Sequence, residues 1–113
     1  MGPAATPSVW DHERVPFFAA LTIHLHLPDN GSLKGKRKEL LSVKAALARR
    51  YGATVAEVDH HDLWQRSTLA AGLVGKSAPD LERSIVAIER YLEQRFPEGV
   101  RLERRLVSFS DLD

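Results

Sequence analysis

Residues 17–52 read FFAALTIHLHLPDNGSLKGKRKELLSVKAALARRYG, and this stretch decides the fold class. Within residues 21–27, leucine and isoleucine alternate with threonine and histidine, which is the period of a strand with one buried face. A turn rich in Pro, Asp, Asn and Gly follows, and Ser32 is a good N-cap for a helix. Apolar residues then recur at helical spacing as far as Tyr51, and Gly52 is placed to supply a left-handed C-cap.

The rest of the chain continues this alternation of strands and helices. Residues 54–58 and 67–74 have the composition of strands, and the polar connection 60–66 separates them. A helix with a capping-box pattern is expected over residues 77–96, and a last strand over 100–109. The order βαββαβ predicts an α+β, two-layer ferredoxin-like sandwich, with an antiparallel four-stranded sheet and both helices on one face.

The domain organisation follows from length and proline content. The chain has 113 residues, enough for one domain with a buried core but short for two. Three of the six prolines fall in residues 1–16, which we expect to form a flexible N-terminal extension. Residues 17–110 are expected to form the single ferredoxin-like domain, and residues 111–113 a short acidic tail.

The composition excludes several classes of protein. Hydrophobic residues make up 43% and charged residues 27% of the chain, as in an ordinary folded domain. No run approaches the ~18–20 apolar residues that cross a bilayer, and the N-terminus lacks the pattern of a secretory signal. The absence of cysteine excludes disulfides, thiolate metal sites and cysteine nucleophiles. We therefore expect a cytoplasmic protein that has no membrane partner.

The net charge of +1 conceals an uneven distribution along the chain. Residues 32–51 carry seven cations against Glu39 alone, a local charge of +6, so the other 93 residues sum to −5. The seven cations are Lys34, Lys36, Arg37, Lys38, Lys44, Arg49 and Arg50. A cationic face without a large apolar stripe favours a phosphate-rich partner over a membrane. We expect these seven residues to bind RNA.

The start of the predicted helix is unusual because cations crowd its first turns. The positive end of the helix dipole normally favours acids, and Gly35 weakens the helix by ~1 kcal/mol relative to alanine. Exposed backbone N–H groups beside clustered Lys and Arg favour a phosphate-binding site, with a merely solvated charged face as the alternative. Lys36 and Lys44 fall inside the apolar stripe, where their stems can cover the edge of the core.

A second cluster lies in the connection between the middle strands. Its members are Asp59, His60, His61, Asp62, Trp64, Gln65 and Arg66. Two acids and two imidazoles in succession can bind a metal, and Asp-His-His is similar to the motif of the DHH phosphoesterases. Those enzymes need further acidic motifs that this chain lacks, and adjacent histidines project in different directions. We expect no metal, no cofactor and no catalytic residue, but a hairpin loop whose aspartates cap N–H groups and whose tryptophan anchors it by burial.

His24 and His26 are two residues apart and therefore project from the same side of the first strand. Together with Thr22 they are expected on the face of the sheet that the helices leave open. On that face the imidazoles can stack on bases or can be ordinary half-exposed residues.

Two blocks of the sequence resemble a known family. LHLP at residues 25–28 with SLKGKR at 32–37, and VAEVDHHDLWQR at 55–66, are similar to the signatures LhLP…SLKxKR and VAEVxxxDLWQRA of the YlxP-like family. These are small bacterial proteins of unassigned function, and the resemblance, over about residues 17–110, implies a ferredoxin-like fold. Their genes often lie among those for translation initiation and ribosome maturation, which implies a role with RNA or the ribosome. Gly35 departs from the family's usual Glu, and the family carries no established catalytic residues.

The sequence therefore predicts a non-catalytic binding module that docks on structured RNA, either ribosomal RNA or a ribosome-assembly intermediate. One alternative is a metal-dependent phosphoesterase that uses the cluster from Asp59 to Asp62. Another is a protein-interaction module or homo-oligomer, joined through the open sheet face or an edge strand.

Overall fold

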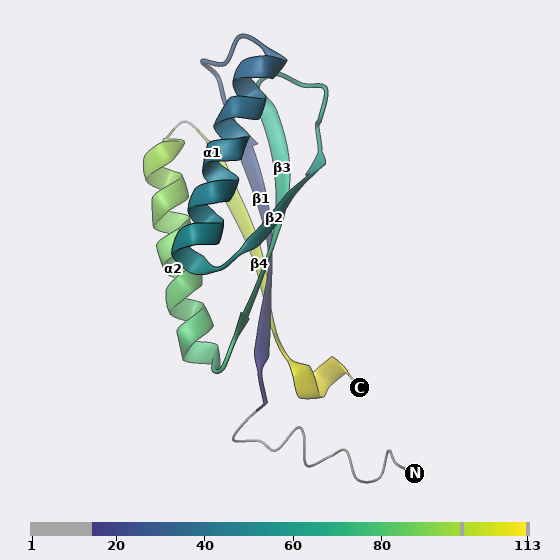
Figure 1. Ribbon diagram of the computed structural model, residues 1–113, viewed down its shortest axis with the longest axis vertical. Coiled ribbons are helices and arrows are strands. Elements are labelled where there is room, and N and C mark those ends of the chain that lie inside the picture. The colour runs from purple at the N-terminus through teal and green to yellow at the C-terminus, as the bar shows by residue number, and fades with distance from the viewer. Residues whose placement is uncertain (1–14, 98, 113) are drawn as a thin grey trace.

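The computed structural model describes residues 15–97 and 99–112, and its elements follow the predicted order (Figure 1). They are β1 (Phe17–His26), α1 (Leu33–Tyr51), β2 (Thr54–Asp59), β3 (Arg66–Gly75), α2 (Ala78–Arg95), β4 (Val100–Ser108) and the 3-10 helix η2 (Phe109–Leu112). All strand pairs are antiparallel, in the order β2-β3-β1-β4, and both helices cover one face of the sheet. The predicted ferredoxin-like sandwich is confirmed.

Local chemistry explains where α1 begins and ends. The Ser32 hydroxyl accepts a hydrogen bond from the Gly35 N–H at 3.0 Å, which satisfies one of the free donors of the first turn. At the other end Gly52 has a φ of 68°, a left-handed conformation that glycine adopts without a Cβ clash. These two caps set the first and last turns of α1, and the first turn lies at the end of the sheet where β1 finishes (Figure 1).

The core lies between the helices and the covered face of the sheet. Alternate residues of β1, from Ala19 to Leu25, are buried there against apolar residues of both helices. The helix residues are Leu40, Val43 and Leu47 of α1, and Leu81, Ile85, Ile88 and Leu92 of α2. Burying a side chain of leucine size contributes ~1.5–3 kcal/mol, so these residues hold the helices on the sheet. Thr22 and His24 alternate with the buried residues of β1 and therefore face the opposite, open side of the sheet, as predicted.

At the two chain ends the structure adds to what the sequence predicted. Val15, which the sequence placed in the flexible extension, is 7% exposed. The Phe109 N–H donates to the Pro16 carbonyl at 3.0 Å, so residues 15 and 16 are part of the fold. The rest of the predicted extension, residues 1–14, lies outside the described residues. Of the two long helices in the described part of the chain, neither is apolar enough to cross a membrane.

Candidate functional site

One end of the domain brings the two sequence blocks together. There the turn after β1, residues 27–32, meets the connection between β2 and β3, residues 60–65, which we call the tip loop (Figure 1). Four hydrogen bonds join the two segments. Asn30 Nδ2 donates to the Trp64 carbonyl at 2.5 Å, and the Leu27 N–H donates to the Gln65 carbonyl at 2.8 Å. Gln65 Nε2 donates to the carbonyls of Pro28 at 3.0 Å and Asn30 at 3.4 Å. The tip loop is therefore held through the backbone carbonyls of Trp64 and Gln65 and through the side chain of Gln65.

Lys36 binds the tip loop to α1. Its side chain is only 2% exposed, because Lys36 lies one turn before Leu40 on the buried stripe of the helix. Its ammonium donates to the carbonyls of His60 at 2.5 Å and Leu63 at 2.8 Å, and it pairs with a Glu57 carboxylate oxygen at 2.9 Å. All three N–H groups thus have acceptors. The prediction that Lys36 contacts phosphate is wrong, since its charge is buried and already bound.

Glu57 completes this buried network from β2. Its carboxylate accepts a hydrogen bond from the buried Ser67 hydroxyl at 2.7 Å as well as from Lys36. Burial alone would raise the pKa of Glu57, but the two hydrogen bonds and the positive charge of Lys36 outweigh it and lower the pKa. Glu57 is therefore ionised at neutral pH, and the network is an ion pair.

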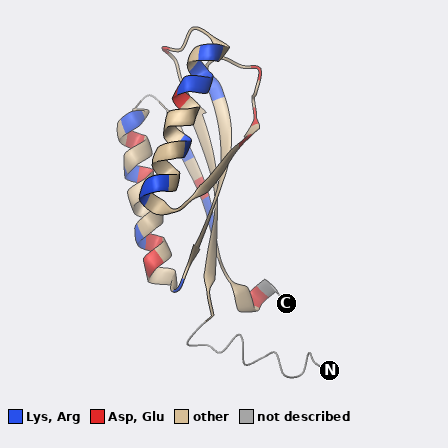
Figure 2. Cartoon of the chain, in the orientation of Figure 1, with Lys and Arg blue, Asp and Glu red and all other residues tan. Residues whose placement is uncertain are grey.

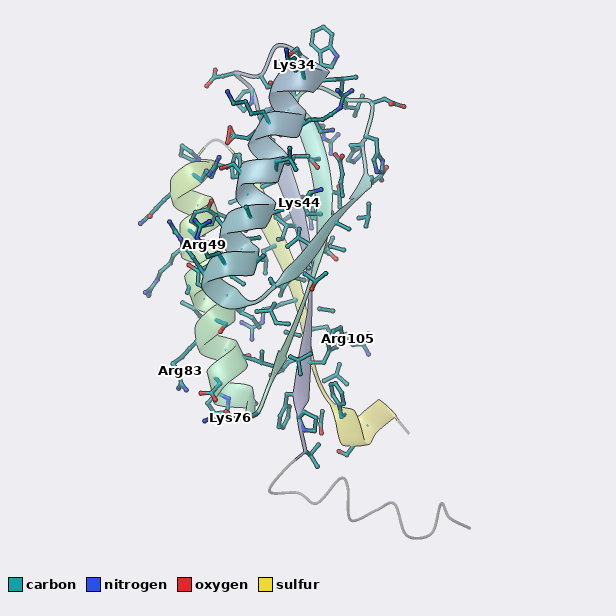
Figure 3. The ribbon with its side chains drawn as sticks, in the orientation of Figure 1. Lys34, Lys44, Arg49, Lys76, Arg83 and Arg105 are labelled. Carbon is teal, nitrogen blue, oxygen red and sulfur yellow. The ribbon has the colours of Figure 1, made fainter. Side chains whose placement is uncertain are left out.

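The other six predicted cations do not form one continuous patch. Lys34, Arg37 and Lys38, which we call the tip cations, are exposed on the first turns of α1, beside the tip loop. Lys44 is half-buried midway along the helix. Arg49 and Arg50 lie at the opposite end, roughly 22 Å from Lys34 at 1.5 Å per residue (Figure 3). The Arg50 guanidinium lies 5.2 Å above the ring of Tyr91, so it has a structural contact within the domain.

The tip loop displays apolar side chains to solvent. Trp64 is 53% exposed and Leu63 is 45% exposed. The prediction that Trp64 anchors the loop by burial is therefore wrong, because the anchoring groups are backbone carbonyls. An exposed indole beside three cations can stack on a nucleobase or pack against an apolar partner.

The acids and histidines of the tip loop point to no common centre. His60 has a φ of 64°, so the chain turns sharply at this residue. Asp59 accepts a hydrogen bond from the His60 N–H at 2.7 Å, which is the capping role predicted for it. Within residues 15–97 and 99–112, no three His, Asp or Glu side chains are grouped so that they can hold a metal. The geometry gives no support to the phosphoesterase alternative.

A hollow of about 480 Å³ lies where the tip loop meets the end of β1. We call it the tip hollow, and its lining residues are His26, Asp62, Leu63, Trp64, Gln65 and Arg66. His26 and Arg66 stand opposite each other in the register of β1 and β3. On the same strand His24 is hydrogen-bonded to Glu103 at 2.8 Å, so it is engaged within the sheet and does not line the hollow.

Three residues of the site were absent from the predicted set. Asn30 was read only as part of a turn, whereas its side chain joins that turn to the tip loop. Glu57 and Ser67 form the buried network with Lys36. One signal was available for this network, because a lysine inside an apolar helical stripe requires a buried acceptor.

Comparisons with known proteins agree with this architecture. A family model described as "Protein of unknown function (DUF503)" matches residues 18–104. The uncharacterized protein YlxP of Bacillus subtilis (strain 168) is 27% identical over 70 residues, which are 62% of this chain and 75% of that protein. Among solved structures, the de novo designed protein Foldit4 has a TM-score of 0.53 at 11% identity, over 81% of this chain and 96% of the design. A dimeric ferredoxin-like protein from an uncultured marine organism has a TM-score of 0.43 at 11% identity, over 82% and 94% of the two chains. At 11% identity the likeness to Foldit4 concerns the fold alone.

Proposed function

This chain belongs to the DUF503 family of proteins of unknown function, and we propose that it is a non-catalytic module that docks on structured RNA. The target is ribosomal RNA or a ribosome-assembly intermediate. The proposal depends on one observation: a loop whose backbone is fixed by hydrogen bonds carries an exposed indole beside three exposed cations. A fold of this kind serves many functions, so the site must carry the argument.

The rigidity of the tip loop is the first support. The carbonyls of His60, Leu63, Trp64 and Gln65 each accept a hydrogen bond from residues 27–36 or, for His60, also from within the loop. A loop fixed in this way loses little conformational entropy when a partner binds. Rigid display of apolar side chains to solvent is typical of a recognition surface.

The charge at the tip is the second support. No ion pair is formed by Lys34, Arg37 or Lys38 with any acid in the described ranges, and Figure 2 shows basic residues banded around this end of α1. Unpaired exposed cations attract phosphates and release counterions when they bind them. Asp62 is exposed on the tip loop and Asp59 is exposed at the end of β2, so we expect phosphates to run along α1 and not along the loop.

Trp64 adds base stacking to the electrostatic attraction of the tip cations. Stacking of a base on an aromatic side chain contributes ~1–3 kcal/mol and tolerates any base. Sequence-specific proteins reach RNA mainly through loops and bulges, whose unstacked bases are free to make this contact. An indole beside cations therefore favours RNA that combines paired and unpaired regions.

Filter binding with ribosomal RNA fragments between about 50 and 200 mM salt tests the proposal. With three or four phosphate contacts, the plot of log affinity against log salt should have a slope of roughly −2 to −3. The double variant Lys34→Glu, Lys38→Glu should bind more weakly across RNA sequences and flatten the slope to about −1.

A matched control separates local contact from net charge. Lys76→Glu with Arg105→Glu makes the same change of charge at exposed positions away from the tip (Figure 3). We expect this control to lose much less affinity than the tip variant. Equal losses in the two variants, or no binding at the lowest salt, would overturn the proposal and favour a protein partner for the tip.

A further inference from the structure

We propose that the tip hollow receives one unpaired nucleotide of the RNA, an inference that rests on the proposed function and specifies what the tip recognises. The hollow opens beside Trp64 and is distinct from the row of tip cations on α1. The hollow is open to solvent, and its volume of about 480 Å³ is comparable to the ~300–1,000 Å³ of ordinary ligand sites.

The lining of the hollow contains each kind of group that a nucleotide needs. The indole of Trp64 offers a face on which a base can stack. Arg66 offers a guanidinium, which binds phosphate through two parallel hydrogen bonds. The Asp62 carboxylate accepts hydrogen bonds from base N–H groups and repels phosphate. These chemistries orient the ligand, with the base edge toward Asp62 and the phosphate toward Arg66.

His26 and Arg66 lie side by side at the edge of the hollow. The His26 N–H donates to the Gly99 carbonyl at 3.0 Å, and a Cβ at position 99 would lie 2.9 Å from the His26 Cβ. Glycine at this position therefore leaves the space that His26 occupies. Arg66 stands beside His26 in the sheet, and within the described ranges it forms no ion pair. Its charge is available to a ligand.

Tryptophan fluorescence can report on the hollow directly. The chain has two tryptophans, Trp10 and Trp64, so Trp10→Phe leaves the tip indole as the single emitter. The probes are an RNA hairpin with an unpaired loop and a blunt duplex of the same stem. We expect both RNAs to bind in the filter assay but only the hairpin to quench Trp64 emission, because only the hairpin has a base free to stack.

A variant that removes the positive charge of Arg66 provides the second measurement. In the Trp10→Phe background, Arg66→Gln should weaken hairpin binding about tenfold and leave duplex binding little changed. Arg105 is exposed on β4 of the same sheet, and Arg105→Gln should leave the binding of both the hairpin and the duplex unchanged.

Each outcome decides one of the two proposals. Binding of both RNAs without hairpin-specific quenching would overturn the assignment of the hollow while leaving RNA docking intact. Equal effects of Arg66→Gln and Arg105→Gln on the hairpin would also overturn it. If neither RNA binds at low salt, RNA docking itself is wrong, and the hollow proposal fails with it.

Discussion

Replacing Lys36 by methionine tests the central feature of the tip. Lys36→Met keeps an unbranched side chain of similar length in the buried stripe but removes the ammonium. The Glu57 carboxylate, whose side chain is 16% exposed, then loses its cationic partner and keeps only the hydrogen bond from Ser67. The carbonyls of His60 and Leu63 each lose a donor. Removing one member of a buried ion pair costs about 3–5 kcal/mol. Since Glu57 retains some contact with water, we expect about 3 kcal/mol.

Urea unfolding measures this loss. With a dependence of about 1.5 kcal/mol per molar urea, the midpoint should fall by roughly 2 M. Lys34→Met is the matched control: it makes the same substitution two residues earlier, at an exposed position, and should change stability by less than about 0.5 kcal/mol. Adding Glu57→Gln to Lys36→Met should restore part of the stability, because it removes the unpaired charge. Equal midpoints for the two methionine variants would refute the buried role of Lys36.

Three further predictions concern the same network and the caps of α1. Because the folded pKa of Glu57 is lowered, its ion pair stabilises the fold fully above the unfolded value near 4.5 and is lost as pH falls through the folded value. Unfolding midpoints measured across this acidic range should therefore fall more steeply in the wild type than in Lys36→Met. Gly35→Ala should fail to give the ~1 kcal/mol that alanine usually adds to a helix, since its Cβ would lie 2.6 Å from Asn30 Oδ1; thermal unfolding checks this. Gly52→Ala should lower stability by about 1 kcal/mol in the same assay, because a φ of 68° strains any residue with a Cβ.

The fold could be predicted from the sequence because its signals are local. Strand alternation in β1 and the Ser32 and Gly52 caps of α1 depend on neighbours within a few residues, so periodicity and capping rules suffice. The antiparallel sheet with both helices on one face also followed, since few arrangements of βαββαβ bury both helices.

The site was predicted less well because its partners are distant in the chain. Lys36 and Glu57 are 21 positions apart, and only the packing of α1 on β2 brings them together. Trp64 was expected to be buried because large aromatic residues usually are, but here hydrogen bonds to backbone carbonyls hold the loop without it. Charge counting likewise grouped cations that lie at opposite ends of α1.

The sheet order β2-β3-β1-β4 also shapes what happens while the chain is being synthesised. β1 emerges from the ribosome first, yet it ends in the interior of the sheet, between β3 and β4. One side of β1 can pair once residue 75 has been added, but the other side stays open until Val100–Ser108 follow. At ~5–20 residues per second this interval lasts about 2–7 s, during which a row of backbone groups can pair with a foreign strand. A nascent chain stalled within that interval therefore exposes one unpaired edge of β1.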